Sequence, residues 1–313
     1  MTNVARLLRV WSPLLAKNRN IVQVRPLETH MRLLSTDIQQ QQQDLLVKYI
    51  DAGEESGEDM GQIVVFAMNR PHVKNALGVN LVKMLVESLE KVKYDKSVRT
   101  LIVSSNVPGI FCAGGDLKER KAMPVNDVGP LVTRGRKIVG EFENLPMPVI
   151  AALDGGAYGG GLEIALACDF RIASTTAKMA LTETKLGIIP GGGGTQRLPR
   201  TIGKGLAKEM IFTGKAVDGN QAEKMGLVNY AVEQNKDGTA AYIKAIKLAK
   251  EICANGPIGV KMAKIAINKG TEVDLQTGLA IEEACYAQVI PTKDRMIALK
   301  AFSEKRRPIF TGE

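Results

Sequence analysis

Short apolar runs that favour β-strands alternate with helical patterns from about residue 63 onward. The runs are separated by turn residues or by segments in which apolar residues recur every three or four positions, as they do in an amphipathic helix. This alternation predicts an α/β fold with mostly short connections. The predicted strands are residues 63–68, 101–103, 149–153 and 170–173, and the predicted helices between them include residues 81–92 and 162–167.

After residue 242 the pattern becomes helical. The segments IKAIKLAKEICA, VKMAKIAINKG and GLAIEEACYAQV have helical spacing, and a fourth helix is expected around residues 294–302. The last two helices are apolar on more than one side, which is typical of helices packed between subunits. We therefore expect an α/β core over residues 45–240 and a helical oligomerisation region over 241–313.

The first segment has the composition of a targeting signal. Five basic residues precede the first acid, Glu28, and the apolar residues between them make the stretch amphipathic if it is helical. This composition is typical of a mitochondrial presequence, and the glutamine run at residues 39–43 is typical of a linker. We expect residues 1–44 to be a transit peptide and linker, and the protein to work in the mitochondrial matrix. A basic tail that touches nucleic acid is the alternative.

Composition excludes several kinds of function. No apolar run approaches the ~18 residues needed to cross a bilayer, and aromatic residues, at 4%, are too scarce for a surface of stacked aromatic rings. The four cysteines lie far apart, and one of the two histidines, His30, lies in the predicted presequence. Disulfide frameworks, metal sites and His-activated nucleophiles are therefore disfavoured. Catalysis must use carboxylates, lysines or backbone amides.

The charge of the chain suits an anionic partner. Residues 1–44 hold six basic and three acidic residues, so the remaining chain keeps a formal charge of +6 out of a total of +9. Such a body suits a phosphorylated metabolite or RNA, and charge alone does not decide between them.

Three glycine clusters interrupt the alternating pattern: FCAGGD at residues 111–116, GGAYGGGLE at 155–163 and PGGGGTQR at 190–197. None matches the phosphate-binding patterns GxGxxG or Gly-Lys-Ser/Thr. The first two follow a predicted strand and lead towards a helix, where small residues leave backbone N–H groups open to a ligand. Two such donors aimed at one point would form an oxyanion hole. For the third cluster we favour close packing.

Four ordered motifs resemble the crotonase superfamily of acyl-CoA hydratases and isomerases. They are FCAGGDLKE, GGAYGGGLEIALACDFRIAS, ETKLGIIPGGGGTQRLPR and FSEKRRPIF, and the similarity runs from about residue 63 to the C-terminus. The resemblance implies a spiral of ββα repeats followed by a helical trimerisation region. It also implies an acyl-CoA thioester substrate, of which coenzyme A is a part, with no separate cofactor or metal. Relatives form trimers that pair into hexamers.

The resemblance assigns four residues to the reaction. It places the two backbone amides that hold the thioester oxygen at Gly115 and Gly160, and the two family glutamates at Glu163 and Glu183. Hydration needs one carboxylate to take a proton from water and another carboxyl group to protonate the α-carbon. We assign the first role mainly to Glu163 and the second to Glu183. Because family members with other reactions often lack one of these acids, the pair favours a hydratase.

The acyl group is less closely defined. The stretches VPGIFCAGGDLKER and GLAIEEACYAQVIPTKDR resemble the branch of the superfamily that acts in leucine degradation. This resemblance implies hydration of 3-methylglutaconyl-CoA to 3-hydroxy-3-methylglutaryl-CoA, with a short-chain enoyl-CoA hydratase as the alternative. A carboxylated acyl chain needs a cationic partner, which the sequence alone does not identify.

The resemblance also implies coenzyme A contacts. Two of the implied residues, Phe302 and Lys305, match positions that reach the acyl pocket or the coenzyme, partly in a neighbouring subunit. Their alternative is a helix end with a solvated basic tail. The other implied contacts are Lys74, Ala76, Ala113, Asp116, Leu117 and Lys118.

Binding of AU-rich RNA is the alternative from another class of function. Some relatives use a lysine-bearing helix for it, which would here run over residues 79–94 with Lys83, Lys91 and Lys93. The spacing of Lys83, Glu87 and Lys91, four residues apart, instead predicts a solvated, salt-bridged face. A valine at position 79, where relatives have lysine, weakens the basic surface further.

Overall fold

The computed structural model describes residues 43–54, 57 and 59–313. The transit peptide predicted for residues 1–44 therefore lies almost entirely outside the described residues. Among those described, no helix is both long enough and apolar enough to span a bilayer.

A six-stranded sheet forms the base of the core, with the strand order β1-β2-β3-β5-β7-β10. Strand β1 pairs antiparallel with β2, and the other pairs are parallel. Strands of a parallel sheet with both faces covered are apolar throughout, which explains the continuous runs in the sequence. The strands are β1 (Leu45–Asp51), β2 (Gln62–Met68), β3 (Val98–Ser105), β5 (Val149–Leu153), β7 (Phe170–Ser174) and β10 (Tyr230–Val232).

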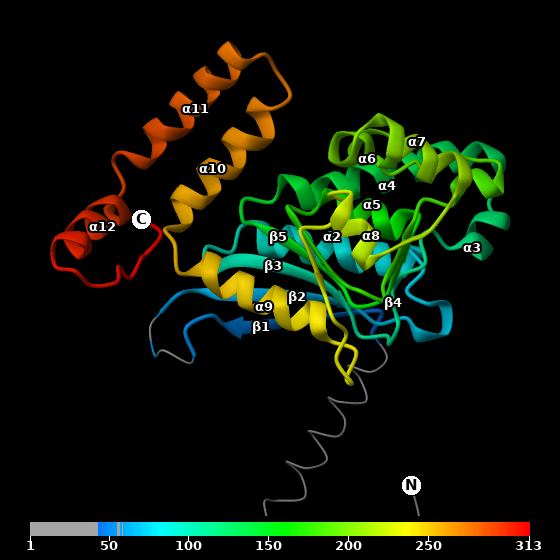
Figure 1. Ribbon diagram of the computed structural model, residues 1–313, viewed down its shortest axis with the longest axis horizontal. Coiled ribbons are helices and arrows are strands. Elements are labelled where there is room, and N and C mark those ends of the chain that lie inside the picture. Colours follow the sequence, from blue (N-terminus) through cyan, green and yellow to red (C-terminus); the bar gives the residue numbers. More distant parts are fainter. Residues whose placement is uncertain (1–42, 55–56, 58) are drawn as a thin grey trace, which may run out of the picture. The chain divides into compact units, whose positions relative to one another are not determined.

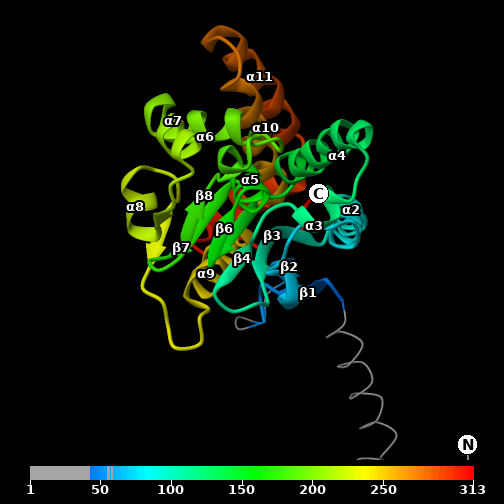
Figure 2. The ribbon, with the colours of Figure 1, turned by 90° about the vertical axis from the view of Figure 1, so that its right-hand side faces the viewer.

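A second sheet of short strands lies beside the first. Strands β4, β6 and β8 run parallel, and β9 pairs antiparallel with β8 (Figure 2). Each of the first three follows a strand of the large sheet in the chain, so the backbone repeats one ββα step and builds a spiral. The predicted crotonase-like architecture is confirmed. The strands are β4 (Ile110–Cys112), β6 (Gly156–Tyr158), β8 (Lys178–Ala180) and β9 (Val217–Asp218).

The helices of the spiral pack over these sheets. Helix α4 was not predicted, because Pro130 and three glycines hide its helical pattern. Helix α5 is buried from its second to its last residue, as its apolar sequence predicted. The helices are α2 (Val79–Lys93), α3 (Leu117–Lys121), α4 (Val125–Asn144), α5 (Gly160–Ala167), α6 (Gly194–Ile202), α7 (Lys204–Thr213) and α8 (Gly219–Lys224), with 3-10 turns η1 (Pro71–Val73) and η2 (Glu183–Leu186).

Four helices follow the spiral, as predicted (Figure 1). Helix α9 covers the outer face of the large sheet through a stripe of alanines and Cys253, all fully buried. Helices α10 and α11 pack against each other, and α11 has no buried residue among its fifteen. The bounds are α9 (Ala240–Cys253), α10 (Pro257–Gly270), α11 (Leu275–Val289) and α12 (Lys293–Ser303).

A buried ion pair fixes α10 to the core. Lys264 donates to the carbonyl of Met147 at 2.9 Å and to Asp169 at 2.8 Å. The same carboxylate oxygen accepts from the amide of Val149, at the start of β5. The helical region is thereby attached directly to the strand that leads into the second glycine cluster.

Candidate active site

The first two glycine clusters meet at one point of the spiral. Gly114 has a φ of +92°, and a Cβ atom there would lie 2.9 Å from the carbonyl oxygen of Tyr158 and 3.3 Å from the amide nitrogen of Gly160. Gly159 also has a positive φ, of +51°. Only glycine combines this conformation with so close a backbone approach. The glycine pattern therefore brings together two loops that lie more than forty residues apart in the chain.

The two amides expected to hold the thioester oxygen lie side by side. The Cβ position that Gly160 lacks is 3.8 Å from the amide nitrogen of Gly115. Neither amide donates to an acceptor within the described part of the chain. Gly160 also begins α5, so the positive end of the helix dipole adds to the field at this place. Two open donors beside a helix N-terminus can stabilise a developing enolate oxygen.

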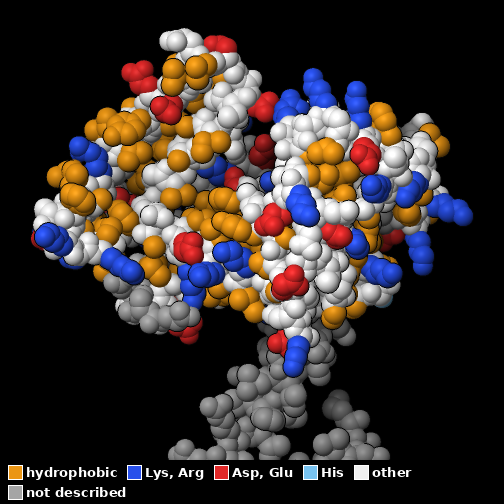
Figure 3. Space-filling model, viewed as in Figure 1, with side chains coloured by type: hydrophobic (Ala, Val, Ile, Leu, Met, Phe, Trp, Pro, Cys, Tyr) orange, Lys and Arg blue, Asp and Glu red, His pale blue; other side chains and the backbone are white. Residues whose placement is uncertain are grey.

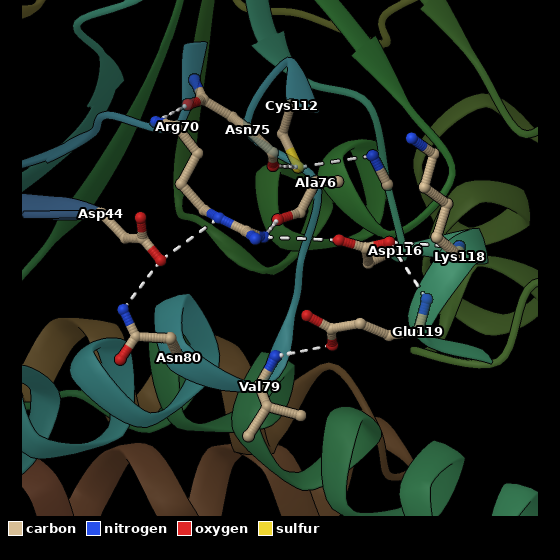
Figure 4. A network of polar contacts seen from close by, with 11 residues as sticks. Asp44, Arg70, Asn75, Ala76, Val79, Asn80, Cys112, Asp116, Lys118 and Glu119 are labelled. Atoms are coloured by element: carbon tan, nitrogen blue, oxygen red, sulfur yellow. Dashed lines mark hydrogen bonds and ion pairs between the residues drawn. The ribbon is translucent and has the colours of Figure 1, made fainter. Parts of the chain in front are cut away.

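A polar network holds the first loop in position (Figure 4). Arg70 donates to the carbonyl of Ala76 and forms ion pairs with Asp44 at 3.2 Å and Asp116 at 3.7 Å. The amide group of Asn75 donates to the carbonyl of Phe111 at 2.9 Å. The loop that carries Gly115 is thus fixed to the segment after β2 by bonds at both of its ends.

Glu163 lies in the first turn of α5 with only 4% of its surface exposed. Its Oε1 atom accepts hydrogen bonds from the amides of Gly192 and Gly194, at 2.8 and 2.7 Å. Burial raises the pKa of Glu163, and these two amides, which favour the charged form, oppose the rise. One oxygen of the carboxylate is thus held in place, and Oε2 accepts no hydrogen bond from a described residue.

Glu183, the first residue of η2, is bound less tightly. Its Oε1 atom lies 3.0 Å from the Cβ position that Gly159 lacks, next to the loop that leads to Gly160. Its Oε2 atom is buried and has no hydrogen-bond partner among the described residues. Burial, together with the negative charge of Glu163, raises the pKa of Glu183 to about 7. The two acids are therefore close enough for their charges to interact, and a large fraction of Glu183 keeps its proton at neutral pH.

The third glycine cluster has a role that the sequence analysis missed. We predicted that PGGGG serves close packing, and a Cβ atom at Gly191 would indeed meet Val132 at 2.8 Å. The cluster also supplies the two amides that bind Glu163. A Cβ atom at Gly192 would lie 2.6 Å from Oε2 of that acid. A glutamate in the first turn of a buried helix, followed by a distant glycine run, is the signal that could have suggested such a contact.

Six of the eight predicted coenzyme A contacts gather around the first loop. Lys74, in a left-handed conformation, accepts a hydrogen bond at its carbonyl from the amide of Ala113, at 3.0 Å. Asp116 caps α3 and is linked through Arg70 to Ala76, and Leu117 and Lys118 follow in α3.

The other two predicted coenzyme A contacts lie elsewhere. Phe302 lies near the end of α12 and is 86% exposed, and Lys305 lies just beyond. Figure 1 shows α12 beyond α10, away from α5. A role for these two residues would thus fall to a neighbouring subunit, and all eight contacts stay predictions.

Two of the three lysines of α2 have acidic partners. Lys83 pairs with Glu87 at 3.9 Å, four residues along the helix, as the spacing predicted. Lys93 pairs with Glu141 at 3.3 Å. Val79 at the start of the helix is 64% exposed. This mixture of charges and an apolar residue gives no support to a basic RNA-binding surface.

Comparison with known proteins agrees with this geometry. The sequence model described as enoyl-CoA hydratase/isomerase matches residues 58–313. The chain belongs to the enoyl-CoA hydratase/isomerase family. It is therefore an enzyme of the hydro-lyase type that acts on coenzyme A thioesters.

Named relatives cover most of the chain. It is 58% identical over 256 residues to human methylglutaconyl-CoA hydratase, mitochondrial. The aligned region covers 82% of this chain and 76% of the human protein. The chain is 52% identical over 258 residues to the mouse enoyl-CoA hydratase domain-containing protein 2, mitochondrial. That alignment covers 82% of this chain and 87% of the mouse protein. A crystal structure of enoyl-CoA hydratase from Bacillus anthracis superimposes with a TM-score of 0.80 and 44% identity, covering 87% of this chain and all of that one.

The contact between the third glycine cluster and Glu163 can be tested by Gly192→Ala. The added Cβ atom would displace the carboxylate, and misplacement of a catalytic group by about 1 Å can cost on the order of 100-fold in rate. We expect such a loss of kcat in steady-state hydration assays, with binding of an acyl-CoA retained. Gly205→Ala is the matched control, because a Cβ atom at this helical position meets no atom within 4 Å. Equal rates for the two variants would contradict the assigned contact.

Proposed function

We propose that the enzyme hydrates 3-methylglutaconyl-CoA to 3-hydroxy-3-methylglutaryl-CoA, a step of leucine degradation, in the mitochondrial matrix. The observation that carries the hydratase mechanism is the pairing of Glu163, held by two amides, with Glu183, whose buried Oε2 atom lacks a described partner. The choice of acyl group is supported by the named relative at 58% identity. The mitochondrial location is supported by the names of both curated relatives.

The proposed reaction divides the work between backbone and side chains. The amides of Gly115 and Gly160 bind the thioester oxygen, where negative charge grows as the double bond accepts the nucleophile. One such donor contributes roughly 3 kcal/mol to stabilising a transition state of this kind. Because the donors are fixed by the polar network and the start of α5, they need no reorganisation as the charge develops.

The two acids move the protons. Ionised Glu163 removes a proton from a water molecule as its oxygen bonds to the β-carbon, and protonated Glu183 delivers its proton to the α-carbon. One O–H bond of the water breaks while C–O and C–H bonds form, and the proton gained by Glu163 equals the one lost by Glu183. Burial raises the pKa of Glu183 to about 7, which suits this acid to donate a proton.

The substrate assignment is tested by the ratio of kcat/KM for 3-methylglutaconyl-CoA to that for crotonyl-CoA. We expect the ratio to favour the carboxylated substrate by at least about tenfold, which corresponds to about 1.4 kcal/mol of differential transition-state binding. Steady-state kinetics of the purified enzyme on both thioesters measure it. A preference for crotonyl-CoA would instead support the short-chain enoyl-CoA hydratase alternative.

The roles of the acids are tested by Glu163→Gln and Glu183→Gln. Each variant should lose about 10²- to 10⁴-fold in kcat while it still binds an acyl-CoA, because a general acid or base contributes about this much. In the wild type, kcat should fall as pH rises through about 7, where Glu183 loses its proton. Glu183→Gln should abolish this fall. Glu90→Gln, an exposed change on α2, is the control, and wild-type turnover in either active-site variant would refute the assignment.

We also propose that the C-terminal helices join subunits into trimers that pair into hexamers. Helix α11 buries none of its residues in the described chain, and Figure 3 shows hydrophobic side chains gathered over this region. Exposed apolar patches of this kind mark interaction surfaces. The exposed side chains include Leu275, Leu279, Tyr286, Ile290, Leu299 and Phe302.

The assembly is tested by light scattering of the wild type at several concentrations. We expect the mass of a trimer or of a pair of trimers. Tyr286→Lys should lower this mass, because a charge would be buried in the contact. Lys269→Glu, an exposed change at the end of α10, is the control for charge. A wild-type enzyme that stays monomeric would contradict the proposal.

A further inference from the structure

Arg120 lies directly beside the first oxyanion amide. A Cβ atom at Gly115 would be 2.5 Å from Nη2 and 2.7 Å from Cζ of this arginine. The guanidinium therefore occupies the space that a side chain at position 115 would fill. Because position 115 is glycine, the cation can lie next to the place where the thioester oxygen is expected.

The same cation acts on both acids. Its positive charge is one of the causes that lower the pKa of Glu163 and of Glu183, against the larger effect of burial. Arg120 thus lies beside Gly115 and within electrostatic range of both carboxylates. These are the groups between which the acyl chain has to lie.

Neighbouring arginines have partners, and Arg120 has an open guanidinium. Arg197 is bound to Glu143 at 2.6 Å and to the carbonyl of Gly192 at 3.1 Å, and Arg70 is bound within the polar network. The side chain of Arg120 forms no hydrogen bond or ion pair with any residue that the structure describes. A cation next to a site for an anion, with its donors open, is suited to bind a ligand carboxylate.

The backbone beneath this side chain is well held. Asp116 caps α3 by accepting from the amides of Lys118 and Glu119, at 3.1 and 3.3 Å (Figure 4). Glu119 in turn accepts from the amide of Val79 at the start of α2, at 3.0 Å. The helix that presents Arg120 is thereby capped at its start and fixed to α2, so the fold holds the backbone from which the cation extends.

We propose that Arg120 binds the distal carboxylate of the acyl chain and so selects carboxylated enoyl-CoA thioesters over uncharged ones. This inference rests on the proposed hydratase function and names the residue that recognises its substrate. The planar guanidinium matches a carboxylate with two parallel hydrogen bonds, which an ammonium cannot do. It also offsets the repulsion that a substrate carboxylate would meet from ionised Glu163.

The test compares the binding of two unreactive thioesters, glutaryl-CoA and butyryl-CoA, by titration calorimetry. We expect the wild type to bind glutaryl-CoA more tightly. Arg120→Met should weaken the binding of glutaryl-CoA by about 10- to 100-fold, the range for a hydrogen bond to a charged group. The binding of butyryl-CoA should stay unchanged. Arg120→Lys should restore part of the loss, because it keeps the charge without the planar fork. Lys121→Met removes an exposed cation from the same helix and is the matched control.

Turnover separates this inference from the proposed function. The kcat/KM ratio of 3-methylglutaconyl-CoA to crotonyl-CoA should fall by about 10- to 100-fold in Arg120→Met. Loss of the cation changes the pKa values of the glutamates for both substrates alike, so the ratio isolates the carboxylate contact.

Two results would have different meanings. A wild type that prefers crotonyl-CoA would overturn the assigned substrate, while the binding comparison would still test the carboxylate site. A variant Arg120→Met that keeps the wild-type preference for glutaryl-CoA, or a wild type without that preference, would overturn the role of Arg120.

Discussion

The active site depends on how the fold binds one buried carboxylate. Glu163 is almost completely removed from water, and a buried charge is costly unless hydrogen bonds compensate for it. Two amides of the third glycine cluster provide that compensation, and they lie 29 and 31 residues further along the chain. A side chain on either glycine would collide with the acid. The need to satisfy Glu163 therefore determines the residue type at Gly192 and Gly194.

Unequal treatment of the two acids gives them different chemistry. Glu163 receives two donors on one oxygen, whereas the buried Oε2 atom of Glu183 receives none among the described residues. Burial raises the pKa of both acids, but the two amides that bind Glu163 favour its charged form, whereas the pKa of Glu183 rises to about 7; in the proposed mechanism the first is the base and the second the acid. A water molecule added across a double bond needs such a base and such an acid. Two residues of one type can fill both roles because their surroundings differ.

Local patterns predicted much of the fold and little of the site. Strands β2 and β5 and helix α10 have strong apolar patterns and were predicted close to their observed bounds. Strand β1 was missed, because as an edge strand with several exposed residues it lacks a continuous apolar run. The strands of the second sheet were missed because each has only two or three residues, too few to form a pattern. Contacts within the site join residues far apart in the chain, so no local pattern contains them, and the glutamates were placed by resemblance alone.

The two acids proposed to transfer the protons and the group proposed to choose the acyl chain lie on different elements of the fold. Glu163 and Gly160 belong to α5 and Glu183 belongs to η2, and the two elements approach each other closely at Gly159. Arg120 belongs to the short helix α3, which directly follows the loop that carries Gly115. In the proposed mechanism, a change of side chain at position 120 alters which thioesters are accepted and leaves both proton-transferring acids in place, although it also shifts their pKa values.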